Sequence, residues 1–205
     1  YQDVKKVVGK GIKRYRMKGL YGAPTQCALA VCDGILTNKK KFLEETLRNI
    51  QSLSKGGPEN HFGVFRSSES CLWKAVDLLD DQPIAEPTPQ SSATALFTSL
   101  SVPLALFHKK WSKTLATQCL DLALVFSSHP QEVVGTVLNG FLVTRFLNLK
   151  KDEPISQGKE ILQEAVEICT QAERDYQDRI NVFEDDLIAK SKNAFSQTLE
   201  GLISQ

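Results

Sequence analysis

Six side chains are our candidates for a functional site in this sequence, and none of them is acidic. They are Tyr21, Thr25, Gln26, Ser91, Ser92 and His129. Thr25 offers a hydroxyl and Gln26 a neutral carbonyl, whereas magnesium takes several hard oxygen ligands in near-octahedral geometry. Neutral oxygen ligands of this kind bind a divalent ion too weakly to displace its water ligands. These residues therefore offer polar contacts but predict no catalytic residue and no metal site.

Other groups that resemble catalytic residues fit ordinary structural roles. The adjacent acids Asp80–Asp81 and Asp185–Asp186 are typical of solvated charges, the first pair in a proline-rich loop and the second on an exposed helical face. No histidine lies at metal-ligand spacing from another histidine or a cysteine. His129 is itself expected to cap or pack at a helix terminus.

The segment Tyr21-Gly-Ala-Pro-Thr-Gln26 resembles the helix-opening hexapeptide of the ADP-ribosylglycohydrolases. In that family two adjacent aspartates lie between an aromatic residue and a Thr-Gln pair, and they hold magnesium at the start of a helix. Ala23 and Pro24 occupy those two positions here. The resemblance implies an enzyme fold from which this part of the magnesium site is missing.

Two later segments, in the family's order, extend the resemblance over residues 20–148. Ser128-His-Pro-Gln-Glu132 is similar to a family helix start, Thr/Ser-His-x-x-x-Glu-Ala. Ser101-Val-Pro-Leu-Ala-Leu106 is similar to the family's Arg-x-x-Pro-Leu-Gly helix, although Leu100 replaces the arginine. The family's Asp-x-Asp-Thr metal motif has no counterpart after residue 149. The resemblance implies an orthogonal multi-helix bundle without its magnesium cofactor.

Length and composition indicate one helical domain, residues 1–205, because 41% hydrophobic residues suffice for one substantial core. A formal net charge of +1 gives no reason to expect nucleic acid or a membrane as partner. The partner is expected to be an unknown small molecule or a protein. Five widely spaced cysteines without a disulfide pattern are typical of a reducing, cytoplasmic setting.

Helical periodicity dominates the chain, and strand alternation is nearly absent, so we predict an all-α fold. Asn38 is the expected N-cap of a helix to residue 53, Ser128 caps another, and Pro103 should kink or split a third. The predicted helices span residues 2–18, 24–36, 38–53, 67–79, 92–108, 112–127, 130–149 and 155–203.

The C-terminal segment 155–203 reads as one long helix with an apolar stripe along one side. The stripe consists of Leu162, Val166, Cys169, Tyr176, Ile180, Phe183 and Leu187, flanked by charges such as Glu173. Such a stripe is buried either across the bundle or in a homodimer, and the sequence leaves both arrangements open.

These observations favour a non-catalytic ADP-ribosylglycohydrolase-like protein with a binding or structural role. One alternative is a metal-independent hydrolase that acts on an ADP-ribosyl or related glycosidic group. Another is a helical interaction module that dimerises through its last helix. The first two predict a cleft at the start of the helix at residue 24, and the third predicts an apolar external stripe.

Overall fold

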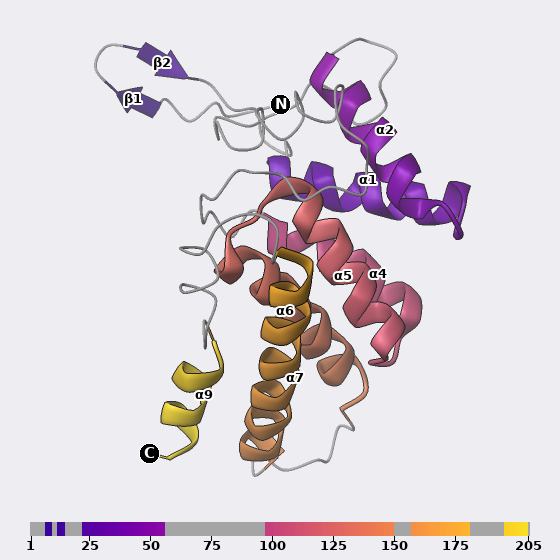
Figure 1. The fold of residues 1–205 in the computed structure, drawn as a ribbon. Helices are drawn as coiled ribbons and strands as arrows, with labels where there is room; N and C mark the ends of the chain where they lie inside the picture. The colour runs from indigo at the N-terminus through magenta and orange to yellow at the C-terminus, as the bar shows by residue number, and fades with distance from the viewer. Residues whose placement is uncertain are drawn as a thin grey trace.

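The computed structural model describes residues 7–9, 12–14, 22–55, 97–149, 157–180 and 195–204. The strands are β1 (Val7–Gly9) and β2 (Ile12–Arg14). The helical elements are α1 (Ala23–Thr37), α2 (Phe42–Lys55), the 3-10 helix η1 (Phe97–Leu100), α4 (Ser101–His108), α5 (Lys113–Phe126), α6 (Pro130–Leu147), α7 (Gln157–Ile180) and α9 (Ser196–Ile203). Helices thus form the body of the described structure, which confirms the all-α prediction (Figure 1).

The exception is the N-terminal segment, for which the prediction of a helix over residues 2–18 is wrong. β1 and β2 pair antiparallel instead, with Val7 opposite Arg14 and Gly9 opposite Ile12. β-Branched side chains lose rotamer freedom in a helix and fit an extended strand. Each glycine inside a helix also costs about 1 kcal/mol relative to alanine, and this segment contains Gly9 and Gly11.

α1 and α2 form a tightly packed helical hairpin at one end of the molecule (Figure 1). Gly34 permits this close approach, because a Cβ atom there would lie 2.8 Å from the carbonyl oxygen of Phe42 and 2.9 Å from the amide nitrogen of Thr46. The Asn49 amide, on α2, donates to the Asp33 carboxylate on α1 at 3.0 Å. α2 starts at Phe42 rather than after Asn38, whose side chain accepts from the amides of the intervening turn.

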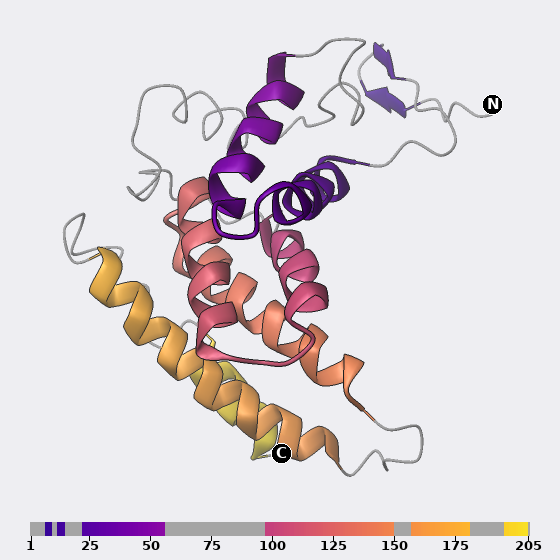
Figure 2. The same cartoon turned by 90° about the vertical axis from the view of Figure 1, so that its right-hand side faces the viewer.

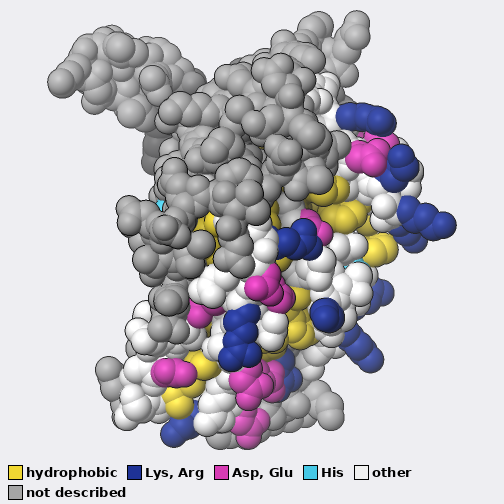
Figure 3. Space-filling model, viewed as in Figure 1, with side chains coloured by type: hydrophobic (Ala, Val, Ile, Leu, Met, Phe, Trp, Pro, Cys, Tyr) yellow, Lys and Arg dark blue, Asp and Glu magenta, His cyan; other side chains and the backbone are white. Residues whose placement is uncertain are grey.

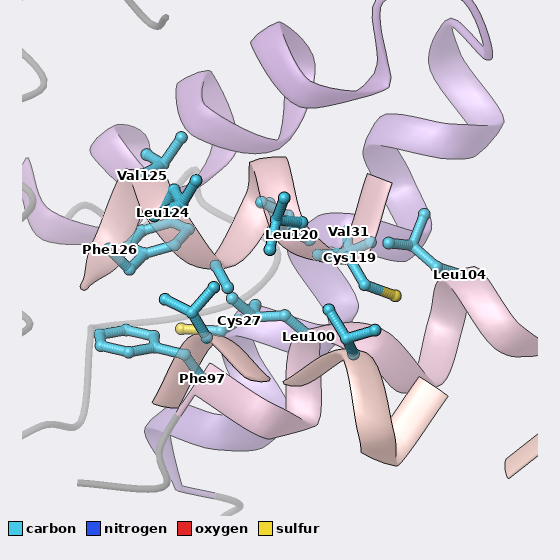
Figure 4. Packing of buried hydrophobic residues seen from close by; sticks show 14 of the residues in the cluster. Cys27, Val31, Phe97, Leu100, Leu104, Cys119, Leu120, Leu124, Val125 and Phe126 are labelled. Atoms are coloured by element: carbon cyan, nitrogen blue, oxygen red, sulfur yellow. The ribbon is translucent and has the colours of Figure 1, made fainter. Parts of the chain in front are cut away.

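The main core lies where α1, η1, α4, α5 and α6 meet (Figure 4). Cys27, Phe97, Leu104 and Phe126 are all almost completely buried, and the rings of Phe97 and Phe126 stack with centroids 5.0 Å apart. Residues distant in sequence therefore share a single apolar interior, and α1 is held to the rest of the bundle through it.

Several predicted helix ends are close to the observed ones. Ser112 caps α5 by accepting from the amide of Leu115 at 3.2 Å. The predicted helix around Pro103 changes from the 3-10 helix η1 to the α-helix α4 between Leu100 and Ser101, and Pro103 lies in the first turn of α4. α6 begins at Pro130, but its N-cap is His129 and not Ser128. A proline at the first helical position leaves the residue just before it to cap.

The prediction of one continuous helix over residues 155–203 is wrong, because α7 and α9 pack beside each other. The carboxylate of Glu173 accepts from the amide of Phe195 at 2.8 Å. In a straight helix these residues would be roughly 33 Å apart, at 1.5 Å per residue. Glu173 is therefore a buried contact of α9 and not a solvated flanking charge.

The buried side of α7 is shifted from the predicted stripe in its first half. Leu162 and Val166 are only half-buried. The buried residues are Ile161, Ala165, Cys169, Ala172, Tyr176 and Ile180, so the last three predicted members within α7 are correct. Ile161 and Ala165 lie one position before Leu162 and Val166, and both pairs have the i, i+4 spacing of a helix face. Packing against α6 and α9 decides which pair is buried. Phe183 and Leu187 lie outside the described residues.

Candidate functional site

The start of α1, where the resemblance places a metal site, carries no acidic side chain. Ala23 is buried, Pro24 lies in the first turn, Thr25 is exposed, and the side chain of Gln26 is fully buried. Gly22 is the N-cap and makes no side-chain cap. Tyr21, Ser91 and Ser92, the other residues predicted near this end of α1, lie outside the described part of the chain.

The structure brings the starts of α1 and α6 together through η1, which contacts both helices. The Ser99 hydroxyl, in η1, donates to the carbonyl oxygen of Pro24 at 3.1 Å. The Phe97 amide, also in η1, donates to the carboxylate of Glu132 at 2.7 Å. η1 therefore links the start of α1 to the start of α6.

Glu132 has a role that the sequence did not indicate. Glu132 is 2% exposed, and its carboxylate accepts the amide of Phe97, the first residue of η1. A buried carboxylate is tolerated when it accepts hydrogen bonds, and the free amides at a helix start supply them. Pattern reasoning within α6 cannot find this contact, because the donor lies 35 residues earlier.

His129 is a capping residue in this structure. Its Nδ1 atom accepts from the amide of Gln131 at 3.3 Å, and its own amide donates to the hydroxyl of Ser127 at 3.1 Å. The adjacent Ser128 carbonyl accepts a hydrogen bond from the hydroxyl of Tyr176 in α7. Burial raises the pKa of Tyr176, which stays protonated as a donor at neutral pH. The segment leading into α6 is thereby fixed to α7.

The residues at the start of α1 do not fit magnesium. Ala23 and Pro24 have no side-chain ligand atom, and the nearby carboxylate of Glu132 already accepts the amide of Phe97. Within the described ranges, no three His, Cys, Asp or Glu residues are grouped as a metal site would need. Asp80, Asp81, Asp185 and Asp186 lie outside those ranges. We therefore derive no chemical step that uses a metal.

A groove of about 360 Å³ lies between α5, α6 and α7, away from the predicted cleft. Its apolar lining comes from Trp111, Ala116, Leu120, Val137, Ile168 and Ala172, and Lys113, Gln171 and Asp175 add polar groups. The indole of Trp111 is held edge-on against Phe141, with ring centroids 5.5 Å apart. Pockets of this size with apolar walls and a few polar groups suit small ligands or single side chains. The sequence does not indicate this groove, because its lining comes from three separate helices.

Comparison with models of protein families, with curated proteins and with solved structures finds no match for this chain. Among the helices that the structure describes, none is both long enough and apolar enough to cross a membrane.

Three buried cysteines give the first testable prediction. Cys27, Cys119 and Cys169 are free thiols, and burial raises the pKa of each to about 12. The negative charge of Glu173 adds to this effect at Cys169. Since the thiolate is the reactive form, we expect these three to resist iodoacetamide in the native protein and to react after unfolding. Mass spectrometry of labelled peptides checks this, and native labelling as fast as in denaturant would contradict it.

The raised pKa values of these thiols also predict how the free energy of unfolding changes with pH. An unfolded thiol loses its proton near pH 8.5, whereas the folded thiols keep theirs to about pH 12. Above about pH 8.5 the unfolded chain therefore binds fewer protons than the folded one, and the free energy of unfolding decreases as pH rises. Replacing Cys119 by Ala removes one such group and should make the decline shallower in urea titrations.

Proposed function

We propose that this chain is a non-catalytic protein with an ADP-ribosylglycohydrolase-like helical core and a binding or structural role. The observation that carries the proposal is the chemistry at the start of α1. Ala23 packs into the interior, and the carbonyl oxygen of Pro24 accepts the Ser99 hydroxyl. Internal packing thus occupies one of the two positions where the family would need a carboxylate, and the other, Pro24, is exposed but has no ligand atom in its side chain. The adjoining starts of α1, η1 and α6 support the family's arrangement of helices.

Binding is favoured over a purely structural role by the groove between α5, α6 and α7. Its apolar walls would exclude water from a planar or aliphatic group, and Lys113 and Asp175 offer opposite charges at its polar part. The resemblance makes an ADP-ribosyl group the first ligand to try. We therefore place binding in this groove and not at the start of α1.

The homodimer alternative rests on the apolar stripe of the C-terminal segment, and the described part of that stripe in α7 does not support it. Cys169, Tyr176 and Ile180 of the predicted stripe are covered within a single chain, by contacts that include α6 and α9. A helix that already buries its apolar side in the bundle leaves no stripe of this kind for a second copy.

We expect the protein to show no turnover of an ADP-ribosylated substrate, with or without magnesium. Pro24→Asp places a carboxylate at an exposed position of the first motif and should still give no activity, because one ligand neither holds the ion nor positions its water. Millimolar magnesium should leave the midpoint of thermal unfolding unchanged, since a ligand stabilises only the state that binds it. Chelator-sensitive turnover by the unaltered protein would overturn the non-catalytic assignment.

Calorimetric titration of the protein with ADP-ribose tests where the ligand binds. Ala116→Trp fills the groove and should abolish the signal, while Thr114→Trp, on the exposed side of α5, should leave it unchanged. Loss of binding in Thr25→Trp instead would move the site to the start of α1. If no ADP-ribose binding is found in the unaltered protein, the binding role derived from the resemblance fails.

A further inference from the structure

One face of the molecule combines exposed apolar side chains with lysines, at the C-terminal ends of α1 and α4. We call it the lysine face. It consists of Leu36, Lys39, Lys40, Leu106, Phe107, Lys109 and Lys110. Leu36 is 81% exposed, Leu106 49% and Phe107 44%, which are high values for side chains of this size. Isolated exposed apolar residues are ordinary, but a group of them between like charges marks an interaction site.

The C-terminal ends of α1 and α4 are in contact with each other. The Nζ atom of Lys39, in the turn after α1, lies 5.4 Å from the ring centroid of Phe107 at the end of α4. The α1–α2 and α4–α5 turns both lie on the side that faces the viewer in Figure 2. Lys109 adopts a left-handed conformation with φ 62°, which ends α4 and begins the turn that carries Lys110.

The charge of this face is locally positive. Within the described ranges, no carboxylate pairs with Lys39, Lys40, Lys109 or Lys110, whereas Lys41 pairs with Glu44 at 3.3 Å. Basic side chains lie along the right-hand edge of Figure 3 with hydrophobic side chains beside them and acidic ones near the upper end, on the side that Figure 2 turns forward. The formal net charge of +1 averages over the whole surface and conceals this patch.

The composition of the lysine face distinguishes between classes of partner. Protein interfaces are depleted in lysine and enriched in arginine, and all four of these cations are lysines. Nucleic acid attracts lysine but presents no apolar layer for exposed residues such as Leu36 and Leu106. An anionic lipid surface supplies both requirements, because phosphates and carboxylates attract ammonium groups and the acyl boundary accepts apolar side chains.

We propose that the lysine face docks this protein on the surface of an anionic lipid membrane. Leu36, Leu106 and Phe107 enter the boundary between head groups and acyl chains, and the lysines contact the anionic head groups. The attachment is peripheral and reversible, since a few partly exposed side chains are far from a membrane span. This proposal is independent of the family resemblance and of the ADP-ribose groove.

Vesicle flotation tests it, with phosphatidylcholine vesicles and with phosphatidylcholine vesicles that contain phosphatidylserine. The full chain is expected to float with the anionic vesicles only, and raised salt should release it. The double variant Lys40→Gln/Lys110→Gln should weaken partitioning by about 25-fold, since each basic residue near such a surface contributes about a factor of five. Leu36→Ser should weaken it by about ten-fold through lost apolar contact.

The matched control is Lys159→Gln/Arg174→Gln, which removes the same charge from exposed positions on α7. It should float like the unaltered protein. Equal flotation with neutral vesicles, no flotation at all, or equal weakening by the α7 control would each overturn the proposal. Light scattering provides a further check: self-association that Leu36→Ser abolishes would assign the lysine face to a second copy of the chain and reject the membrane.

Discussion

Gly34→Ala is expected to lower the free energy of unfolding by about 3 kcal/mol, although alanine is the better helix former. The added Cβ would meet the Thr46 hydroxyl at 2.6 Å and backbone atoms of Phe42 and Thr46 at 2.8 and 2.9 Å. Backbone atoms cannot rotate away as a side chain can, so α1 and α2 must separate. Urea unfolding measured by circular dichroism gives the change in stability.

Gly158→Ala is the control for this experiment, because Gly158 is also helical but a Cβ there meets nothing within 4 Å. It should raise stability by less than about 1 kcal/mol, since that is the gain for alanine over glycine in a helix interior and Gly158 lies in the first turn of α7. If both variants were stabilising, the close packing of α1 on α2 would be wrong. The opposite signs therefore separate packing from helix propensity.

Glu173→Ala is expected to cost about 3 kcal/mol and to loosen α9 in particular. The buried carboxylate accepts from the Phe195 amide at 2.8 Å, the Ser196 amide at 3.2 Å and the Ser196 hydroxyl at 2.9 Å. Hydrogen bonds to a charged group are each worth about 1.5–3 kcal/mol, and the amides at the start of α9 would lose their acceptor. Hydrogen exchange measured by mass spectrometry should show α9 deprotected more than α5.

Two further variants isolate the role of the carboxylate. Glu173→Gln keeps one acceptor oxygen for the two amides, and its NH2 group can donate to the Ser196 hydroxyl, so it should recover part of the stability although the charge is lost. Glu167→Ala removes an exposed glutamate from the same helix and should change stability by less than about 0.5 kcal/mol. Unchanged exchange of α9 in Glu173→Ala would show that its attachment depends on apolar contacts alone.

The candidate sites were only partly accessible to sequence reasoning. The neutral character of the first motif follows directly from Ala23 and Pro24, and the capping role of His129 was anticipated. The groove was missed because its walls come from three helices, and each wall residue looks ordinary within its own helix. The lysine face was missed because net charge is a sum over the chain, whereas an interaction patch depends on which residues are neighbours.

Local patterns determined the helices whose ends are marked by their own residues. Ser112 caps α5, Pro130 opens α6, and Pro103 lies in the first turn of α4, because capping and ring geometry act within one turn. Tertiary structure decided the rest. The buried side of α7 depends on α6 and α9, and the two buried glutamates reach amides 35 and 22 residues away. A periodic pattern records only distances along one helix, so such contacts arise only when separate helices pack.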